Sequence, residues 1–136
     1  MTGPDFPMSD AAVAADLITM RRSDGGTAHP GVVVLAPVGE LDQVSASAVW
    51  APLAEQLVAG HHVVLDLSGI EFFASVGVKI LMAACARARD VGAALVIVAA
   101  GAVVRRPLEL LGVLDQLPIY AEREYALGVC ARQPTS

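Results

Sequence analysis

The stretch VVLDLSGIEFFASVGVKIL, residues 63–81, decides the fold. It opens with an apolar run, residues 63–67, that has the length and β-branched composition of a buried strand. A Ser-Gly turn and two aromatic residues follow, and Ser75 then stands before an apolar pattern of helical spacing. A serine in this place can cap the helix, or it can carry a phosphate that the helix N-terminal amides stabilise. Which of the two Ser75 does bears directly on function.

Strand and helix patterns alternate along the rest of the chain. Strand patterns occupy residues 15–22, 32–38, 63–67, 94–99 and 117–120, and helix patterns occupy residues 44–59, 75–91, 102–111 and 122–130. The first strand alternates apolar and polar residues, which favours an edge, and residues 23–31 form a turn-rich connection. Short links between alternating elements predict an α/β fold, with a mixed, mostly parallel sheet of about five strands flanked by about four helices.

The element boundaries have local signals. Asp42 is placed to cap helix 44–59, which Gly60 ends, and Gly112 closes helix 102–111. Pro107 lacks a backbone donor, so the regular part of that helix is expected to begin near residues 104–106, with Pro107 in its first turn. The sequence thus predicts one domain over residues 15–130, between flexible tails at residues 1–14 and 131–136.

Composition points to a soluble protein. A chain of 136 residues forms one domain, and 55% hydrophobic with 17% charged residues argues against global disorder. The mean hydropathy of +0.60 raises the question of a membrane span. However, the strongly apolar uncharged run between Asp90 and Arg105 is shorter than the roughly 18–20 residues that cross a bilayer. The first 15 residues contain acidic side chains and no basic cluster before an apolar core, so no signal peptide is expected. The prediction is a cytoplasmic protein without a membrane span.

The two cysteines are expected to be reduced thiols, because the cytoplasm keeps thiols reduced. Cys85 falls among apolar helix positions and is interpreted as a small core residue rather than as a redox partner of Cys130.

Enzymatic and nucleic-acid functions find little support. The net charge is −5 and the basic residues are scattered, which argues against nucleic acid as a partner. The histidines lack metal-ligand spacing, and no G-x-G-x-x-G or Walker loop is present, so no metal, nucleotide or other cofactor is expected. Ser75 also lacks the G-x-S-x-G context of a nucleophile elbow. We therefore expect a protein that is not an enzyme.

Three motifs in order resemble STAS domains of the anti-sigma factor antagonist type. GELD (residues 39–42) follows a buried strand and resembles the family's Gly-Glu-Leu-Asp motif. VLDL (64–67) followed by FFASVG (72–77) is similar to the family's strand and its Asp-Ser-Ser/Thr-Gly motif. RPLELLGV (106–113) is similar to the third helix and the turn after it. The resemblance covers roughly residues 15–130.

The resemblance implies the STAS fold and a partner, an anti-sigma factor with a kinase-like fold. In this family the unmodified antagonist binds that partner and frees a sigma factor, and so regulates transcription. The partner phosphorylates a serine of the antagonist with ATP, which breaks the complex, and a phosphatase restores it. By this resemblance Ser75 falls on the phosphoacceptor position, Asp42 on the acidic position of the adjacent loop, and Gly77 on the motif glycine.

The chain departs from the family pattern beside Ser75. Ala74 replaces the usual aspartate, Val76 replaces the second hydroxyl residue, and Lys79 stands where a small residue is common. Two readings follow: a partner adapted to this site phosphorylates Ser75, or the protein is regulated otherwise. Lys79 shares a helix face with Ser75 and can reach back toward it. The predicted partner-binding residues are Asp42, Ser75, Val76, Gly77 and Lys79.

A second function remains open at this point. STAS-like domains also serve as cytoplasmic accessory modules of anion and lipid transporters, where they regulate a membrane partner. A chain without a membrane span is compatible with both roles.

Overall fold

The computed structural model of the protein describes residues 17–135, so the predicted N-terminal tail and the start of the predicted first strand lie outside the described residues. Within this range the strands are β1 (Ile18–Gly25), β2 (His29–Leu41), β3 (His62–Asp66), β4 (Ile70–Phe73), β5 (Ala94–Val98) and β6 (Ile119–Tyr120). The helices are α2 (Ala46–Gln56), α3 (Ser75–Val91), α4 (Ala102–Leu110) and α5 (Arg123–Arg132), with a 3-10 turn, η1, at Leu114–Gln116.

The strands form one mixed sheet. Its order is β1-β2-β3-β5-β6, and β4 pairs with β2 beyond the end of β3. The β1–β2 pair is antiparallel and the other pairs are parallel. The structure confirms the predicted α/β class, the mostly parallel sheet and the edge position of the first strand.

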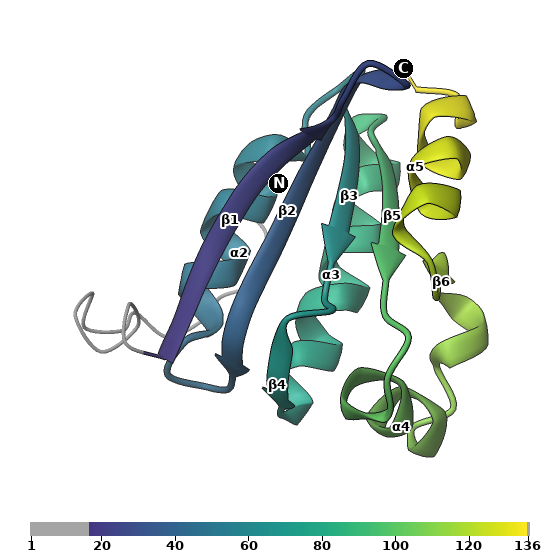
Figure 1. The fold of residues 1–136 in the computed structure, drawn as a ribbon. Coiled ribbons are helices and arrows are strands. Elements are labelled where there is room, and N and C mark those ends of the chain that lie inside the picture. The colour runs from purple at the N-terminus through teal and green to yellow at the C-terminus, as the bar shows by residue number, and fades with distance from the viewer. Residues whose placement is uncertain (1–16, 136) are drawn as a thin grey trace.

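Helices cover both faces of the sheet (Figure 1). In that view α2 and α3 lie behind the sheet, and they enclose the larger core cluster together with α4, which contributes Val104 and Leu108. On the opposite face α5 covers a smaller cluster with Ala126, Leu127 and Cys130. Every residue of β5 is buried, because helices pack against both of its faces.

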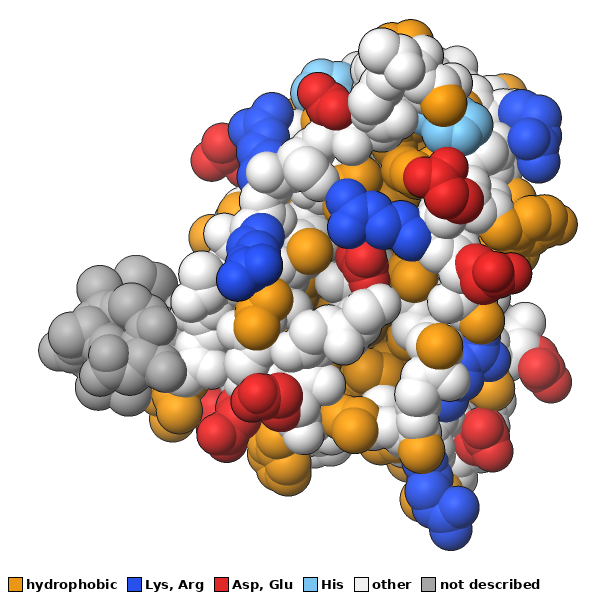
Figure 2. All heavy atoms as spheres, in the orientation of Figure 1, with side chains coloured by type: hydrophobic (Ala, Val, Ile, Leu, Met, Phe, Trp, Pro, Cys, Tyr) orange, Lys and Arg blue, Asp and Glu red, His pale blue; other side chains and the backbone are white. Residues whose placement is uncertain are grey.

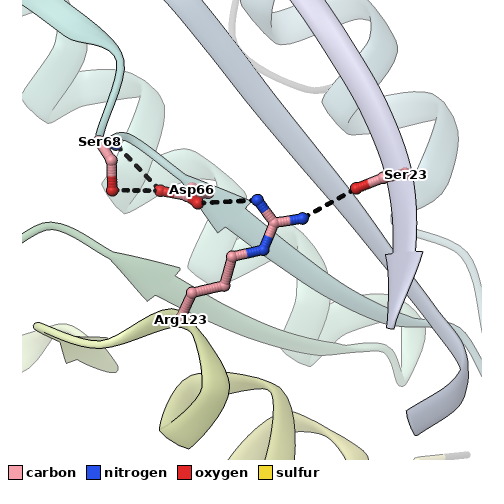
Figure 3. A network of polar contacts seen from close by, with 4 residues as sticks. All are labelled: Ser23, Asp66, Ser68 and Arg123. Atoms are coloured by element: carbon pink, nitrogen blue, oxygen red, sulfur yellow. Dashed lines mark hydrogen bonds and ion pairs between the residues drawn. The ribbon is translucent and has the colours of Figure 1, made fainter. Parts of the chain in front are cut away.

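Acidic and basic side chains are interspersed on the face that α5 partly covers (Figure 2). A polar network crosses this face (Figure 3). Asp66, only 5% exposed, accepts hydrogen bonds at Oδ1 from the Ser68 amide at 3.0 Å and from its hydroxyl at 2.6 Å. Its Oδ2 pairs with Nη1 of Arg123 at 3.3 Å, and Nη2 of Arg123 donates to Oγ of Ser23 at 2.9 Å. The network joins β3 and α5 to β1.

The N-terminal hairpin is longer than predicted. The segment 23–31 was expected to be a connection, but β1 continues to Gly25 and β2 begins at His29. The polar residues of this segment pair across the antiparallel ladder, with Ser23 opposite Val34. Only a tight turn remains, in which Asp24 Oδ1 accepts from the Gly26 amide at 2.8 Å. An exposed edge strand tolerates polar residues, so composition alone did not reveal it.

Strand β4 was not predicted. It pairs in parallel with the end of β2, where Gly39 lies opposite Ile70 and Leu41 opposite Phe73. At four residues it is too short to give a clear alternating pattern, and its pairing partner lies about 30 residues earlier in the chain.

Helix α3 has the predicted bounds, and Gly92 ends it in the left-handed conformation with φ 80°. Helix α2 is shorter than predicted, because it begins at Ala46 and ends at Gln56, before Gly60. Strand β6 is also shorter, since the Leu117 amide closes η1 by bonding the Leu114 carbonyl.

The predicted start of α4 is wrong. The helix begins at Ala102, so Pro107 lies inside it and not in its first turn. The proline removes one intrahelical hydrogen bond, the one that the carbonyl of Val103 would accept. Val104 and Leu108, on either side of Pro107 along the helix, are buried in the core, and this packing holds the helix across it.

The two cysteines lie on opposite faces of the sheet and are both free thiols. Cys85 is half-buried and packs against the larger cluster, as the sequence predicted, whereas Cys130 belongs to the smaller one. Burial raises the pKa of both thiols, that of Cys130 to about 11. Among the described residues, no helix has the length and apolar character that a membrane span requires.

Candidate functional site

The loop after β2 and the start of α3 lie side by side. Leu41 ends β2 opposite Phe73, which ends β4, and the Ala74 amide donates to the Leu41 carbonyl at 2.9 Å. Asp42 follows Leu41 directly and Ser75 is the second residue after Phe73, so they reach the same edge of the sheet. Two residues separated by more than 30 positions in sequence are thereby brought together.

Asp42 organises its own loop and does not cap α2. Its Oδ1 accepts from the amides of Val44 at 2.9 Å and Ser45 at 3.1 Å, an Asx-type turn ahead of the helix. The N-cap residue is Ser45, whose hydroxyl instead donates to the carbonyl of Glu40 at 2.7 Å. The prediction that Asp42 caps this helix is therefore wrong. The other carboxylate oxygen of Asp42 makes no hydrogen bond within residues 17–135.

Ser75 is the first residue of α3, so of the two roles that the sequence left open for it, that of helix cap does not apply. The N-cap is Ala74, extended at φ −80° and ψ 171°, and no side chain bonds the first-turn amides. Ser75 is exposed, and its hydroxyl makes no hydrogen bond within the described part of the chain. Ser75 is thus an exposed residue at a helix start whose first-turn amides no described side chain caps.

Val76 and Gly77 lie beneath this surface. Val76 is 8% exposed and belongs to the larger core cluster. A Cβ atom on Gly77 would lie only 2.5 Å from Cε1 of Phe73, so the glycine permits the aromatic ring to pack on the helix backbone. Both residues position the start of α3, and a direct contact of either with a partner stays a prediction.

Lys79 is exposed, one turn after Ser75 on the same side of α3. Sequence reasoning missed two apolar side chains at this end of the molecule: Val44 in the Asp42 loop is 42% exposed, and Phe72 on β4 is 51% exposed. The alternation of outward Phe72 with inward Phe73 was the available signal for a strand with one exposed face. We call the edge formed by the Asp42 loop, the end of β4 and the start of α3 the Ser75 surface, with the residues Val44, Phe72, Asp42, Ser75 and Lys79. Phe72 points away from α3 at this edge, because its neighbour Phe73 packs against Gly77 of that helix.

Comparison with known proteins identifies the family of this chain. A family model described as the STAS domain matches residues 27–126. The anti-sigma-F factor antagonist RsfB of Mycobacterium tuberculosis is 40% identical over 118 residues, which cover 84% of this chain and 90% of that protein.

Solved structures agree. An anti-sigma factor antagonist from Mycobacterium paratuberculosis matches with a TM-score of 0.67 and 32% identity, over 90% of this chain and 98% of that one. The antagonist SpoIIAA, at 16% identity, shares the fold, with TM-scores of 0.63 in its unphosphorylated form and 0.59 in its phosphorylated form. Each match covers 82% of this chain, and 96% and 99% of the respective SpoIIAA chains. The chain therefore belongs to the STAS domain proteins of the anti-sigma factor antagonist family.

Proposed function

We propose that the protein is an anti-sigma factor antagonist, which binds an anti-sigma factor of kinase-like fold and thereby frees a sigma factor for transcription. The observation that carries the proposal is the 40% identity with RsfB across 84% of the chain. The same relationship favours this function over an accessory module of a transporter. The protein would act in the cytoplasm, where its partner and the sigma factor meet.

The proposed contact is the Ser75 surface. It combines two exposed apolar side chains, Val44 and Phe72, with the charged groups of Asp42 and Lys79. Exposed apolar side chains rimmed by polar ones are typical of protein–protein interfaces. We expect the apolar pair to provide affinity and the charges to orient the partner.

Phosphorylation of Ser75 is the proposed switch. A phosphate adds about −1.5 to −2 charge, which the uncapped first-turn amides of α3 and the Lys79 ammonium can stabilise. The Ser75 hydroxyl makes no internal hydrogen bond, so its modification breaks no contact within the described fold. The fold should stay intact, while the added charge and bulk at the centre of the surface oppose partner binding.

The departure at position 74 is compatible with this switch. Alanine leaves the N-terminal amides of α3 without a capping side chain, and no acidic residue stands in the first turn to repel a phosphate. On this proposal the protein carries out no chemistry itself. The partner transfers the phosphate from ATP, and a phosphatase removes it.

The test is to mix the protein with its cognate anti-sigma factor and Mg-ATP, and to locate any phosphate by peptide mass spectrometry. Ser75→Ala should abolish phosphorylation. Ser47→Ala is the matched control, because Ser47 also lies in the first turn of a helix, α2, and its replacement should have no effect. Phosphate at another residue, with Ser75 unmodified, would overturn the proposed switch. Failure of the unmodified protein to bind the anti-sigma factor would overturn the proposed function.

Asp42→Asn tests the acidic contact. Reversing the charge would also break the two hydrogen bonds that Oδ1 accepts from Val44 and Ser45, whereas asparagine retains an oxygen acceptor there. We expect weaker partner binding with a nearly unchanged melting temperature. Unchanged binding would place the interface elsewhere.

A further inference from the structure

The outer edge of β5 is only partly covered. Alternate residues of β5 direct their backbone groups to opposite neighbours: the Ala94 amide bonds the His61 carbonyl on the β3 side. The amides of Ile97 and Ala99 instead bond the carbonyls of Pro118 and Tyr120, on the β6 side. Leu95 has the same parity as Ile97, so its N–H and C=O point toward the β6 side.

No strand meets Leu95 there. The pairing of β5 with β6 begins only at Ile97, opposite Ile119. One step earlier, the ladder would require an N–H at position 118 to bond the Leu95 carbonyl, but that residue is proline. The amide two residues before Pro118, that of Gln116, is already used, because it donates to the Val113 carbonyl in η1. Within residues 17–135, neither backbone group of Leu95 has a hydrogen-bond partner.

The unpaired edge opens into a cavity of about 190 Å³ between α3, β5 and the segment before β6. Besides Leu95 and Pro118, its lining includes Cys85, Arg89, Gln116 and Gln133. Arg89 is exposed and makes no ion pair within the described residues. The lining thus combines a residue whose backbone donor and acceptor are unpaired, Leu95, with two glutamines and one positively charged arginine.

We propose that this cavity is a second protein-binding site, which accepts a short extended peptide segment of a partner as an added strand beside Leu95. A peptide main chain supplies the acceptor and the donor that the Leu95 N–H and C=O lack, in the manner of strand addition at a sheet edge. The positive charge of Arg89 selects an acidic side chain on that segment. The site is distinct from the Ser75 surface, because Arg89 lies 14 residues after Ser75 in α3, about 21 Å along the helix axis.

Amide hydrogen exchange and NMR on the isotope-labelled protein test the proposal. In the free protein the Leu95 amide should exchange at least about tenfold faster than that of Ile97, which is hydrogen-bonded. The probe is the blocked peptide acetyl-Val-Glu-Val-amide at millimolar concentration. It should shift the Leu95 resonance and slow its exchange. The same peptide with N-methylated internal amides has lost the main-chain N–H groups that a strand would offer to β5, and it should not bind.

Two variants sharpen the test. Pro118→Ala restores an N–H that can bond the Leu95 carbonyl and extend β6, so it should abolish peptide binding without loss of stability. Arg89→Gln should weaken the acidic peptide several-fold and leave the neutral acetyl-Val-Gln-Val-amide unaffected. Arg106→Gln, an exposed arginine on α4, is the matched control and should bind the acidic peptide normally.

Three results would overturn the proposal: slow exchange of the Leu95 amide in the free protein, no shift of Leu95 with the acidic peptide, or equal binding by Pro118→Ala. None of them bears on the Ser75 surface, so the proposed function can stand if this site fails.

Discussion

Replacing Gly77 with alanine tests how the start of α3 is held. In an ordinary helix interior the change stabilises, since alanine is favoured over glycine by about 1 kcal/mol. Here the new Cβ would lie 2.5, 2.7 and 2.9 Å from Cε1, Cζ and Cδ1 of Phe73. Carbon atoms pack at about 3.5–4.0 Å, so the ring would have to retreat by about 1 Å.

The ring has little room to move, because Phe73 is only 6% exposed and lies within the larger core cluster. Overpacking of this kind costs about 1–3 kcal/mol. After the propensity gain of about 1 kcal/mol is subtracted, we expect the free energy of unfolding of Gly77→Ala to fall by up to about 2 kcal/mol.

Gly128→Ala is the matched control. Gly128 is also a buried glycine within a helix, α5, but the atom nearest to the Cβ that alanine would add is Nη1 at the flexible end of Arg132, at 3.2 Å. This variant should be more stable than the parent by up to about 1 kcal/mol. Urea unfolding with an unchanged slope measures both. If Gly77→Ala gains stability as Gly128→Ala does, the packing argument for Gly77 is wrong.

The remaining predictions concern stability and thiol chemistry. Asp66→Asn should lower the free energy of unfolding by about 1–3 kcal/mol in urea titrations, since Asp66 is buried and accepts three hydrogen bonds. Arg123→Gln should cost less than about 1 kcal/mol, because the Arg123 side chain is 43% exposed, and an equal loss would contradict this asymmetry. Pro107→Ala should raise the melting temperature by restoring a hydrogen bond within α4, and a lower value would show that the proline ring matters more through packing. Iodoacetamide should label half-buried Cys85 before buried Cys130, as followed by peptide mass spectrometry. Because burial raises the pKa of Cys130 from 9.0 to about 11, its thiol ionises first in the unfolded chain, so stability should fall as pH rises through this range, and less so in Cys130→Ala.

The sequence predicted best those elements whose signals are local. The bounds of α3 followed from a long apolar period closed by Gly92, which adopts the left-handed conformation that ends the helix. β4 was missed because its four residues form a strand only by pairing with the distant end of β2. The start of α4 was misplaced because tertiary packing of Val104 and Leu108 outweighs the local effect of Pro107.

The candidate site divides in the same way. The proximity of Asp42 and Ser75 could be expected, because residues that follow neighbouring parallel strands meet at one edge of a sheet. Which residues cap α2 and α3 could not be predicted, because the answer changes when the start of a helix moves by a few residues. The burial of Gly77 under Phe73 is a tertiary contact that no periodic pattern encodes.

The most direct test of the central claim is the release of sigma factor from its complex with the cognate anti-sigma factor, followed by native mass spectrometry as this protein is added. The unmodified protein should displace the sigma factor and form a complex with the anti-sigma factor. The same protein phosphorylated at Ser75 should remain folded and displace none. Absence of release by the unmodified protein, or equal release by both forms, would contradict the account.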